Sequence, residues 1–299
     1  MITVFGSINM DLVATAKRLP KPGETVTGET FSTAAGGKGA NQALAARRAG
    51  ATVKMAGAAG DDTFAAPALT LLRDAGTDLS LVKTAPGATG TAVILIGEGG
   101  ENMISVIPAA NGEVSASDAT RTISEMAAGD ILMLQFEIPA AAIEAALTAA
   151  RAKRITTIIN TAPLTADAPR LSALADIVIA NETEFELLIG KNGLSSDGRE
   201  TELKALHETT GQTLIVTLGA DGVIAIRNGK VYRASGLKIE PVDTVGAGDT
   251  FCGYLAASLD QGIEFERALK RAAVAGSLAC TRAGAQPSIP LAAEVDAAL

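Results

Sequence analysis

The sequence predicts an α/β fold in which helices cover both faces of a mostly parallel β-sheet and a smaller sheet is attached to it. Two observations lead to this fold class. After Asn111, short apolar segments of strand length alternate with helical segments, which is typical of a parallel sheet covered on both faces. Before Asn111, residues 13–32 and 91–107 alternate apolar and polar side chains around turns rich in Gly or Pro, which predicts two hairpins that join in a small sheet.

Length and composition restrict the class of protein. The chain has 299 residues, of which 47% are hydrophobic and 19% are charged, so it can bury a large core and is not a disordered chain. We expect a single domain over residues 1–299, with a β lid formed by about 10–35 and 90–108; two domains are the alternative. The formal net charge is -8 without a long Lys or Arg run, which argues against nucleic acid or an anionic membrane as a partner.

The lack of a visible targeting signal and the placement of the two cysteines predict a cytoplasmic protein. No basic leader precedes the first strand, and no apolar run approaches the ~18 residues of a membrane span. Cys252 and Cys280 lie in apolar helical patterns without CxxC spacing, which predicts buried free thiols in a reducing compartment. The only histidine, His207, lies among polar residues and is expected on a solvated helix surface, so a histidine-based catalytic triad is not expected.

The first strand, at residues 2–5, is followed by Asn9 and Asp11. If the chain stays extended, these side chains point to the same side and offer an amide and a carboxylate to one polyhydroxyl ligand. A solvated strand face is the alternative.

Consecutive glycines then precede a helix at residues 40–49. They allow a ligand to approach the backbone closely, and Lys38 and Asn41 share a face of that helix. Lys38 is followed by Gly39, and Gly6 stands alone after the first strand, so this is neither a Walker A loop nor a dinucleotide fingerprint. A flexible loop without a ligand is the alternative.

Further elements follow in order, and polar residues stand where the strands end. In a parallel sheet, ligands bind beyond the carboxyl ends of the strands, where we expect Glu137, Asn181, Glu184, Thr217 and Asp249. Asn181 and Glu184 also have capping-box spacing, and residues 217–222 fit a hairpin turn, so structural roles are open alternatives. We expect strands at 53–56, 131–134, 156–160, 177–180, 213–217 and 223–227 and helices at 62–75, 117–127, 140–152, 182–189, 200–209 and 265–281.

The stretch 243–251 joins an extended segment, 237–242, to an apolar helix at about 251–259. Gly246, Ala247 and Gly248 leave backbone N–H groups uncovered at a helix start, which attracts anions. We interpret this turn as an anion hole for a transferring phosphoryl group, with Asp249 as the base that takes a proton from the attacking hydroxyl. The alternative is an ordinary glycine turn in which Asp249 caps the helix.

Six motifs together resemble the ribokinase branch of the PfkB carbohydrate kinases. They occur in the expected order along the whole chain, at residues 6–11, 22–25, 36–42, 181–184, 243–249 and 281–288. The resemblance implies a Rossmann-like α/β/α sandwich with a β lid that often pairs two subunits into a homodimer. It also implies transfer of the ATP γ-phosphoryl group to the hydroxymethyl group of a small sugar, with D-ribose as the first choice. Deoxyribose, tagatose, fructose or a nucleoside are alternative acceptors.

The resemblance also implies a role for each matching residue. It places the sugar at Asn9, Asp11, Gly37, Lys38, Asn41 and Glu137, with Asp249 as base. It places ATP at Asn181, Thr217, Gly219 and Gly222, the water shell of Mg²⁺ at Glu184, and the anion hole at the amides of Gly246, Ala247 and Gly248. A K⁺ site would use Asp243, Val245, Ala279, Arg282, Gly284 and Ser288, several of them through main-chain carbonyls.

Some features depart from the family pattern or leave alternatives. Ala-Ala-Asn at Asn111 replaces the usual Gly-Ala-Asn, and Val245 stands where Thr or Ala is more usual. Asp243 alternatively caps a turn or pairs with Arg282. A non-catalytic sugar-binding regulator on the same fold would not need Asp249, and a nucleoside kinase would stack a base on aromatic rings, whereas aromatics are only 3% of this chain and Trp is absent.

Overall fold

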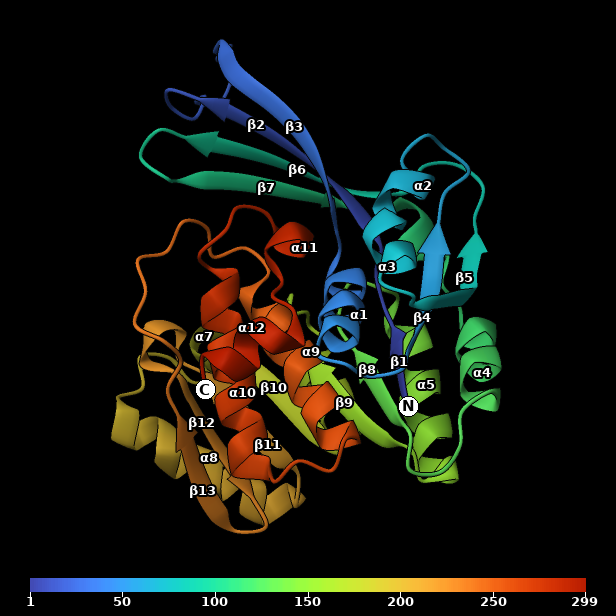
Figure 1. The fold of residues 1–299 in the computed structure, drawn as a ribbon, viewed down its shortest axis with the longest axis vertical. Helices are drawn as coiled ribbons and strands as arrows, with labels where there is room; N and C mark the ends of the chain where they lie inside the picture. Colours follow the sequence, from blue (N-terminus) through green and yellow to red (C-terminus); the bar gives the residue numbers. More distant parts are fainter.

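The structure, a computed structural model, describes residues 1–299 and contains a large sheet and a small one (Figure 1). The large sheet has nine strands in the order β13-β12-β11-β10-β9-β8-β1-β4-β5. β12 is antiparallel to both of its neighbours, and every other neighbouring pair is parallel, as the sequence predicts. The strands are β1 (Ile2–Phe5), β4 (Val53–Ala59), β5 (Asp78–Thr84), β8 (Ile131–Leu134), β9 (Thr156–Asn160), β10 (Ile177–Asn181), β11 (Thr213–Thr217), β12 (Val223–Arg227) and β13 (Lys230–Ala234).

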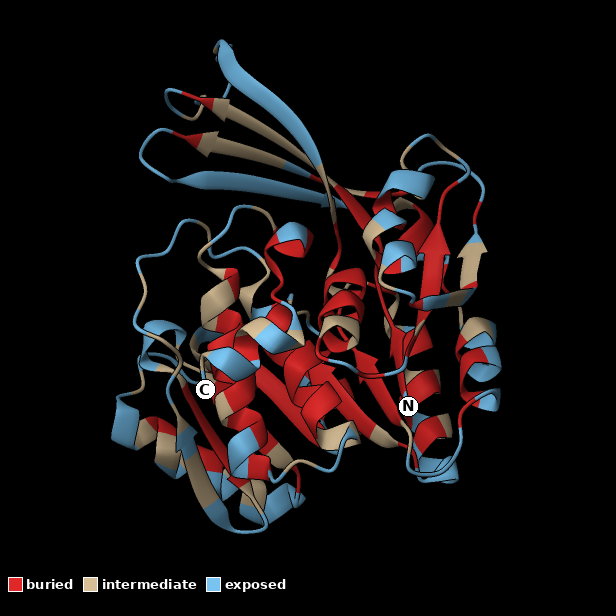
Figure 2. Cartoon of the chain, viewed as in Figure 1, coloured by how far each residue is buried: buried red, intermediate tan, exposed pale blue.

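Helices cover both faces of the large sheet, because its strands are apolar on both sides. Along β8, Ile131 and Met133 join one hydrophobic cluster, while Leu132 and Leu134 join another on the opposite face. The buried core therefore forms two layers, one on each face of the sheet, and most strands of the large sheet are coloured as buried in Figure 2. The first face is covered chiefly by α1 (Lys38–Arg48), α3 (Thr70–Asp74), α9 (Ala247–Asp260) and α10 (Phe265–Ala279), and the second by α4 (Ala116–Ser124), α5 (Ala140–Lys153), α6 (Ala168–Ser172), α7 (Glu182–Leu188) and α8 (Ser196–Thr210).

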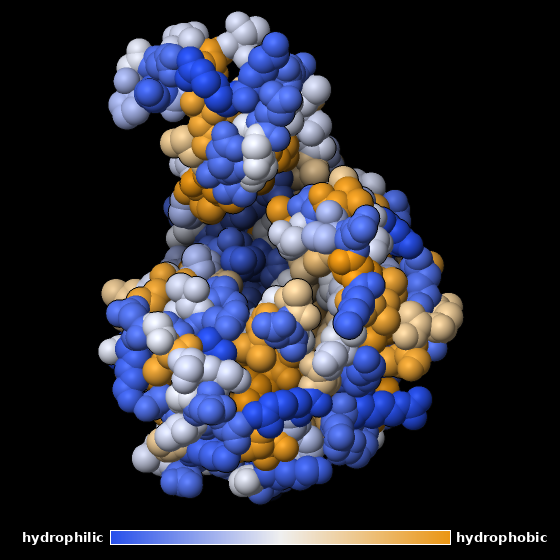
Figure 3. Space-filling model, turned by 90° about the vertical axis from the view of Figure 1, so that its left-hand side faces the viewer, coloured by the Kyte–Doolittle hydropathy of each residue, from blue (hydrophilic) through white to orange (hydrophobic).

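The small sheet stands at one end of the large one, and its two edge strands are mostly exposed, whereas its two central strands are mostly half-buried. Its order is β3-β2-β6-β7, with antiparallel hairpins β2/β3 and β6/β7 joined by a parallel β2/β6 pair. In Figure 3 it projects above the body of the molecule, over a hydrophilic recess. We call these four strands the lid: β2 (Asn9–Ala16), β3 (Gly28–Gly36), β6 (Gly90–Gly97) and β7 (Asn102–Ile107).

Several predicted elements differ from the observed ones. The helix predicted at 62–75 is two short helices, α2 (Ala65–Ala68) and α3, which separate at Leu69, where the N–H bonds Ala66 O at 3.3 Å instead of the carbonyl four residues back. Residues 237–242 form no strand, so Asp249 does not follow a strand end. The helix predicted at 251–259 starts earlier, at Ala247, and carries Asp249 in its first turn.

The strands β5 and β13 and the short helices α6, α11 (Ala285–Ser288) and α12 (Ala292–Ala297) lie outside the predicted elements. They are short segments that weak local patterns do not separate from loops.

Two single-residue predictions also need correction. Cys252 is buried, but Cys280 is only half-buried, because it caps α10 at the surface. His207 is not simply solvated: its Nδ1 lies 2.6 Å from Gln212 O and its Nε2 accepts from Gly229 N at 2.9 Å, so it joins α8 to neighbouring turns.

No helix combines the length and apolar character required to cross a membrane.

Candidate active site

The site is built around the first turn of α9. Gly246, the N-cap, has φ 77°, and a Cβ at that position would lie 2.9 Å from Ala285 Cα, so glycine is required on both conformational and steric grounds. A Cβ at Gly248 would meet nothing within 4 Å, which leaves open space beside the turn. The amides of Gly246, Gly248 and Asp249 make no hydrogen bond within the chain, whereas Ala247 N bonds Thr244 O at 3.3 Å. The turn therefore offers free donors to an anion.

Asp249 is buried, with 7% of its surface exposed, and both of its carboxylate oxygens are hydrogen-bonded by α1. Asn41 Nδ2 donates to Oδ2 at 2.9 Å, and Gln42 Nε2 donates to Oδ1 at 3.0 Å. The structure thus brings Asn41 and Asp249 together across 208 residues of sequence. Gln42 was not among the predicted site residues, although a buried amide in an alanine-rich helix was a signal for it.

A cluster of acids with one lysine lies next to Asp249. Glu137 Oε2 accepts hydrogen bonds from Ser7 Oγ at 2.5 Å and from Lys38 N at 3.0 Å, at the start of α1. Asp11, half-buried on β2, lies against Gly36, where a Cβ would come within 2.4 Å of Asp11 Oδ2. Burial raises the pKa of Asp11 to about 6, and the carboxylates of Glu137 and Asp249 act in the same direction.

Asn9 is almost fully buried and is oriented by Asn111. Asn111 Nδ2 donates to Asn9 Oδ1 at 2.7 Å, and Asn111 is itself fixed by the N–H and carbonyl of Ile8. Because Asn9 Oδ1 is engaged, its Nδ2 is the group that it offers to a ligand. Gly37 packs directly on Asn9, since a Cβ at Gly37 would lie 2.7 Å from Asn9 N. The sequence shows Asn111 only as part of a motif that departs from the family pattern. Nothing in the sequence indicates that Asn111 is the partner of Asn9.

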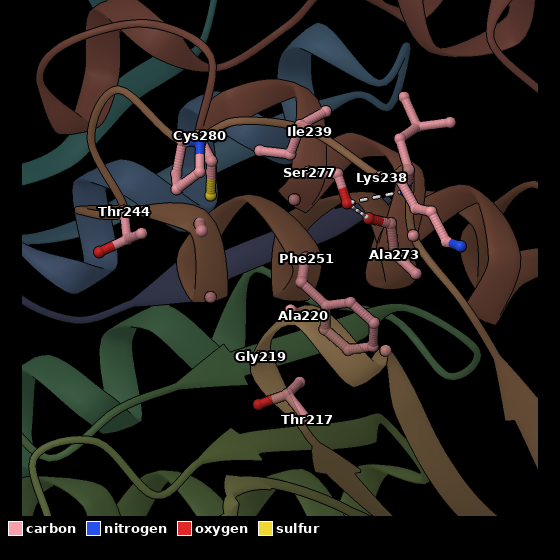
Figure 4. A pocket seen from close by; sticks show the side chains of 17 residues that line it. Thr217, Gly219, Ala220, Lys238, Ile239, Thr244, Phe251, Ala273, Ser277 and Cys280 are labelled. Atoms are coloured by element: carbon pink, nitrogen blue, oxygen red, sulfur yellow. Dashed lines mark hydrogen bonds between the residues drawn. The ribbon is translucent and has the colours of Figure 1, made fainter.

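A cavity of about 600 Å³ lies between the turn after β11 and the helices α9 and α10 (Figure 4). The end of β11 and the turn after it form one wall, with Thr217, Gly219 and Gly222, and α9 and α10 form the other, with Gly248 and Phe251 among the lining residues. Its wall is made mostly of small and apolar groups, and its volume is in the range that holds a nucleotide.

A second, more polar cavity of about 220 Å³ adjoins the first and shares Thr217, Thr244 and Gly248 with it. Its lining also includes Lys38, Asn181, Glu184 and Asp249, so it connects the large cavity with the carboxylate. Burial lowers the pKa of Lys38, but the carboxylates of Asp249, Glu137 and Glu184 outweigh it, so the pKa of Lys38 is raised and its charge is retained.

Asn181 and Glu184 form the capping box that the sequence left as an alternative. Asn181 Oδ1 accepts from Glu184 N at 2.8 Å, and Glu184 Oε2 accepts from Asn181 N and Thr161 Oγ1, each at 3.0 Å. Glu184 Oε1 takes no hydrogen bond within the chain, although the residue lines the polar cavity. The capping role therefore leaves one carboxylate oxygen available to a ligand, as the water shell of Mg²⁺ would require.

The loops before α9 and after α10 are tied together by Asp243. Its Oδ1 accepts from Val245 N at 3.0 Å and its Oδ2 from Gly284 N at 2.8 Å. The turn-capping alternative for Asp243 is thus observed, whereas the Asp243–Arg282 pair is not, because Arg282 pairs with Glu294.

The same loops contain oxygens that suit a monovalent cation. The carbonyl oxygens of Val245, Arg282 and Gly284 accept no hydrogen bond within the chain, which is the donor set that K⁺ prefers. Two other predicted ligands have internal partners: Ala279 O accepts from Arg282 N at 3.3 Å, and Ser288 Oγ donates to Ala285 O at 2.9 Å.

A buried carboxylate at a helix start, between a nucleotide-sized cavity and an acid cluster suited to hydroxyl groups, defines the class of the protein as a phosphotransferase with an alcohol acceptor. Residues 1–292 match the sequence model of the pfkB family of carbohydrate kinases, and the chain belongs to this family.

Individual relatives agree with this assignment. The chain is 34% identical to a ribokinase of Haemophilus influenzae, with 97% of this chain and 95% of that protein covered, and 35% identical to a ribokinase of Bacillus subtilis, with 99% and 98% covered. Its structure superposes on that of an Arabidopsis thaliana ribokinase complexed with ribose and ATP with a TM-score of 0.89, at 29% identity and 99% and 97% coverage.

Proposed function

We propose that this carbohydrate kinase transfers the γ-phosphoryl group of ATP to the hydroxymethyl group of D-ribose, forming ribose 5-phosphate. One observation carries the proposal: Asp249 is held between Asn41 and Gln42 where the polar cavity meets the acid cluster, so a base faces both a sugar site and a phosphate site. The similarity to ribokinases over nearly the whole chain supports ribose as the acceptor.

The sugar hydroxyls are bound both by hydrogen-bond donors and by hydrogen-bond acceptors. Asn9 offers a donor, and the carboxylates of Asp11 and Glu137 accept hydrogen bonds from hydroxyl groups. Asn41 Oδ1 is buried without a partner in the chain, which suits it to accept a hydrogen bond from a hydroxyl of the sugar. Gly37 lets the sugar approach the backbone closely.

The nucleotide occupies the two cavities. Its base and ribose lie in the large cavity near Thr217, Gly219 and Gly222, and its phosphates reach the polar cavity beside Asn181 and Lys38. Glu184 would hold Mg²⁺ through water, and this ion supplies neutralisation of phosphate charge when bound.

The transfer step follows from this arrangement. The proton of the sugar hydroxyl passes to Asp249 as the hydroxyl oxygen bonds to the γ-phosphorus, and the bond from that phosphorus to the bridging oxygen of ADP breaks. The free amides of Gly246 and Gly248 and the Lys38 ammonium stabilise the charge on the transferring group.

A coupled assay of ADP release over pentoses, hexoses and nucleosides tests the proposed acceptor. We expect the highest kcat/KM with D-ribose, because specificity is a ratio of kcat/KM values. A higher value with 2-deoxyribose, with a hexose or with a nucleoside would replace ribose as the acceptor while leaving the family unchanged.

We expect K⁺ to activate the enzyme. A cation bound by the carbonyls of Val245, Arg282 and Gly284 would order the loop that precedes the anion hole without touching the sugar. The measurement is kcat in choline buffer titrated with KCl at constant ionic strength, and we expect a saturable rise, with Na⁺ less effective because it fits a cage of carbonyls poorly. A flat response, or an equal response to tetramethylammonium, would contradict the cation site.

We propose that the lid pairs two copies of the chain. Phe31, Met103 and Ile104 are 69%, 55% and 55% exposed, which leaves apolar side chains on a sheet that one molecule does not cover. We expect a dimer in sedimentation velocity, and we expect Ile104→Lys to convert it to a monomer that keeps the wild-type circular dichroism spectrum. Leu187→Lys, at an exposed apolar position on α7 outside the lid, is the control and should remain dimeric. A monomeric wild type would rule this interface out.

A further inference from the structure

Gln42 lies one residue beyond Asn41 on α1 and is enclosed by polar groups. Its exposed fraction is 1%, and it lines neither the nucleotide cavity nor the polar cavity. Its Nε2 donates to Asp249 Oδ1 at 3.0 Å and to Asn160 Oδ1 at 3.2 Å, and its Oε1 accepts from Gln135 Nε2 at 2.7 Å. Gln42 therefore contacts Asp249 from the interior of the protein, and it is placed to act on substrate only through that carboxylate.

The hydrogen-bonding partners determine which way the Gln42 amide points. A carboxylate only accepts hydrogen bonds, so Asp249 requires the Nε2 end of Gln42. The Oε1 end must then face Gln135, which presents its own Nε2. Reversing Gln42 would set its oxygen against Asp249 Oδ1 and against Asn160 Oδ1, which are both acceptors.

The two amide neighbours of Gln42, Gln135 and Asn160, lie at the ends of strands of the central sheet. Gln135 follows β8, and its Oε1 occupies the space where Gly6 has no side chain, since a Cβ there would lie 2.0 Å away. Asn160 ends β9, and its Nδ2 donates to Ile179 O on β10 at 3.2 Å. The orientation of Gln42 is thus set by strands β8, β9 and β10, whereas Asp249 belongs to helix α9.

We propose that Gln42 is the positioning residue for the base. Its hydrogen bond holds Oδ1 of Asp249 in a fixed position relative to the central sheet. Asn41 holds the other oxygen, but its own Oδ1 has no partner in the chain, so in the proposed complex it also contacts the sugar. Gln42 does not contact the sugar, and it keeps the orientation of the Asp249 carboxylate plane constant while the sugar binds. This inference rests on the proposed role of Asp249 as base.

The test replaces Gln42 by Met, which has similar length but no donor. Single-turnover rates at saturating ribose and ATP should fall about 10- to 100-fold, because a hydrogen bond to a charged group is lost. The Kd values of ribose and ATP should change less than about threefold. Removing a donor from a carboxylate favours its protonated form, so the acidic limb of the rate–pH profile should move to higher pH.

Two further variants separate positioning from packing. Gln135→Met removes only the group that orients Gln42, so we expect a smaller rate loss with a pH shift in the same direction. Gln212→Met is the matched control: Gln212 is a buried amide whose Nε2 donates to Ser172 O and Ala175 O, far from both cavities. It should lower Tm while the rate and the pH profile stay unchanged.

The outcomes distinguish this inference from the proposed base. If Asp249→Asn keeps the wild-type rate, the base is misassigned and the inference fails with it. If Asp249→Asn is inactive but Gln42→Met keeps both the rate and the pH profile, only the inference is overturned. A rate loss in Gln42→Met without a shift of the acidic limb would equally overturn it, because that result assigns Gln42 a packing role alone.

Discussion

Asp249→Asn is expected to lower kcat by about 10²- to 10⁴-fold, the range that general base catalysis usually contributes. The amide keeps the size of the side chain but cannot take the proton of the attacking hydroxyl. Ribose and ATP should still bind, so the loss should lie in kcat more than in KM. Steady-state kinetics combined with calorimetric binding of both substrates measures the two effects separately.

The control is a similar acid at another helix start. Asp197 lies in the first turn of α8, as Asp249 does in that of α9, but its side chain is exposed and remote from both cavities. Asp197→Asn should leave kcat unchanged. Near-wild-type kcat in Asp249→Asn would remove Asp249 from the mechanism.

Local pattern was sufficient to predict much of the large sheet. The strands at 131–134, 156–160 and 213–217 have the predicted bounds, because each is a short apolar run bounded by polar or turn residues. The prediction of one helix at 62–75 was wrong, because the hydrogen-bond pattern changes at Leu69 and divides the segment in two. The extended segment 237–242 shows the limit of this approach, because extended residues become a strand only if a neighbouring strand pairs with them.

Contacts within the site are long-range and were less predictable. Gln42 meets Asp249 across 207 residues, and Asn111 meets Asn9 across 102, and no local pattern links either pair. Residue type indicated that Asp249 needed a special environment, but only the fold identifies the two amides that provide it. For Asn181 and Glu184, the structural and functional interpretations proved compatible, because a capping box occupies only one oxygen of Glu184.

Asp11→Ala is expected to weaken ribose binding strongly and ATP binding little. A hydrogen bond between a hydroxyl and a carboxylate contributes about 1.5–3 kcal/mol, which corresponds to a rise of about 10- to 150-fold in the Kd of ribose. Asp11 lines neither the nucleotide cavity nor the polar cavity, so the Kd of ATP should stay within about twofold. Calorimetry with each ligand decides, and an unchanged ribose Kd would make Asp11 a polar residue on a solvated strand.

The pH dependence of ribose binding gives the same prediction a second test. Burial, together with the charges of Glu137 and Asp249, raises the pKa of Asp11 to about 6, so Asp11 is a carboxylate above pH 6 and protonated below it. The carboxylate is the better acceptor for hydroxyl groups, so the Kd of ribose should rise as the pH falls from 7 to 5. Asp11→Asn cannot titrate at this position. Its Kd for ribose should be higher than that of the wild type at pH 7 but should change little between pH 7 and pH 5. If the wild type and Asp11→Asn show the same pH dependence, the titrating group that controls ribose binding is not Asp11.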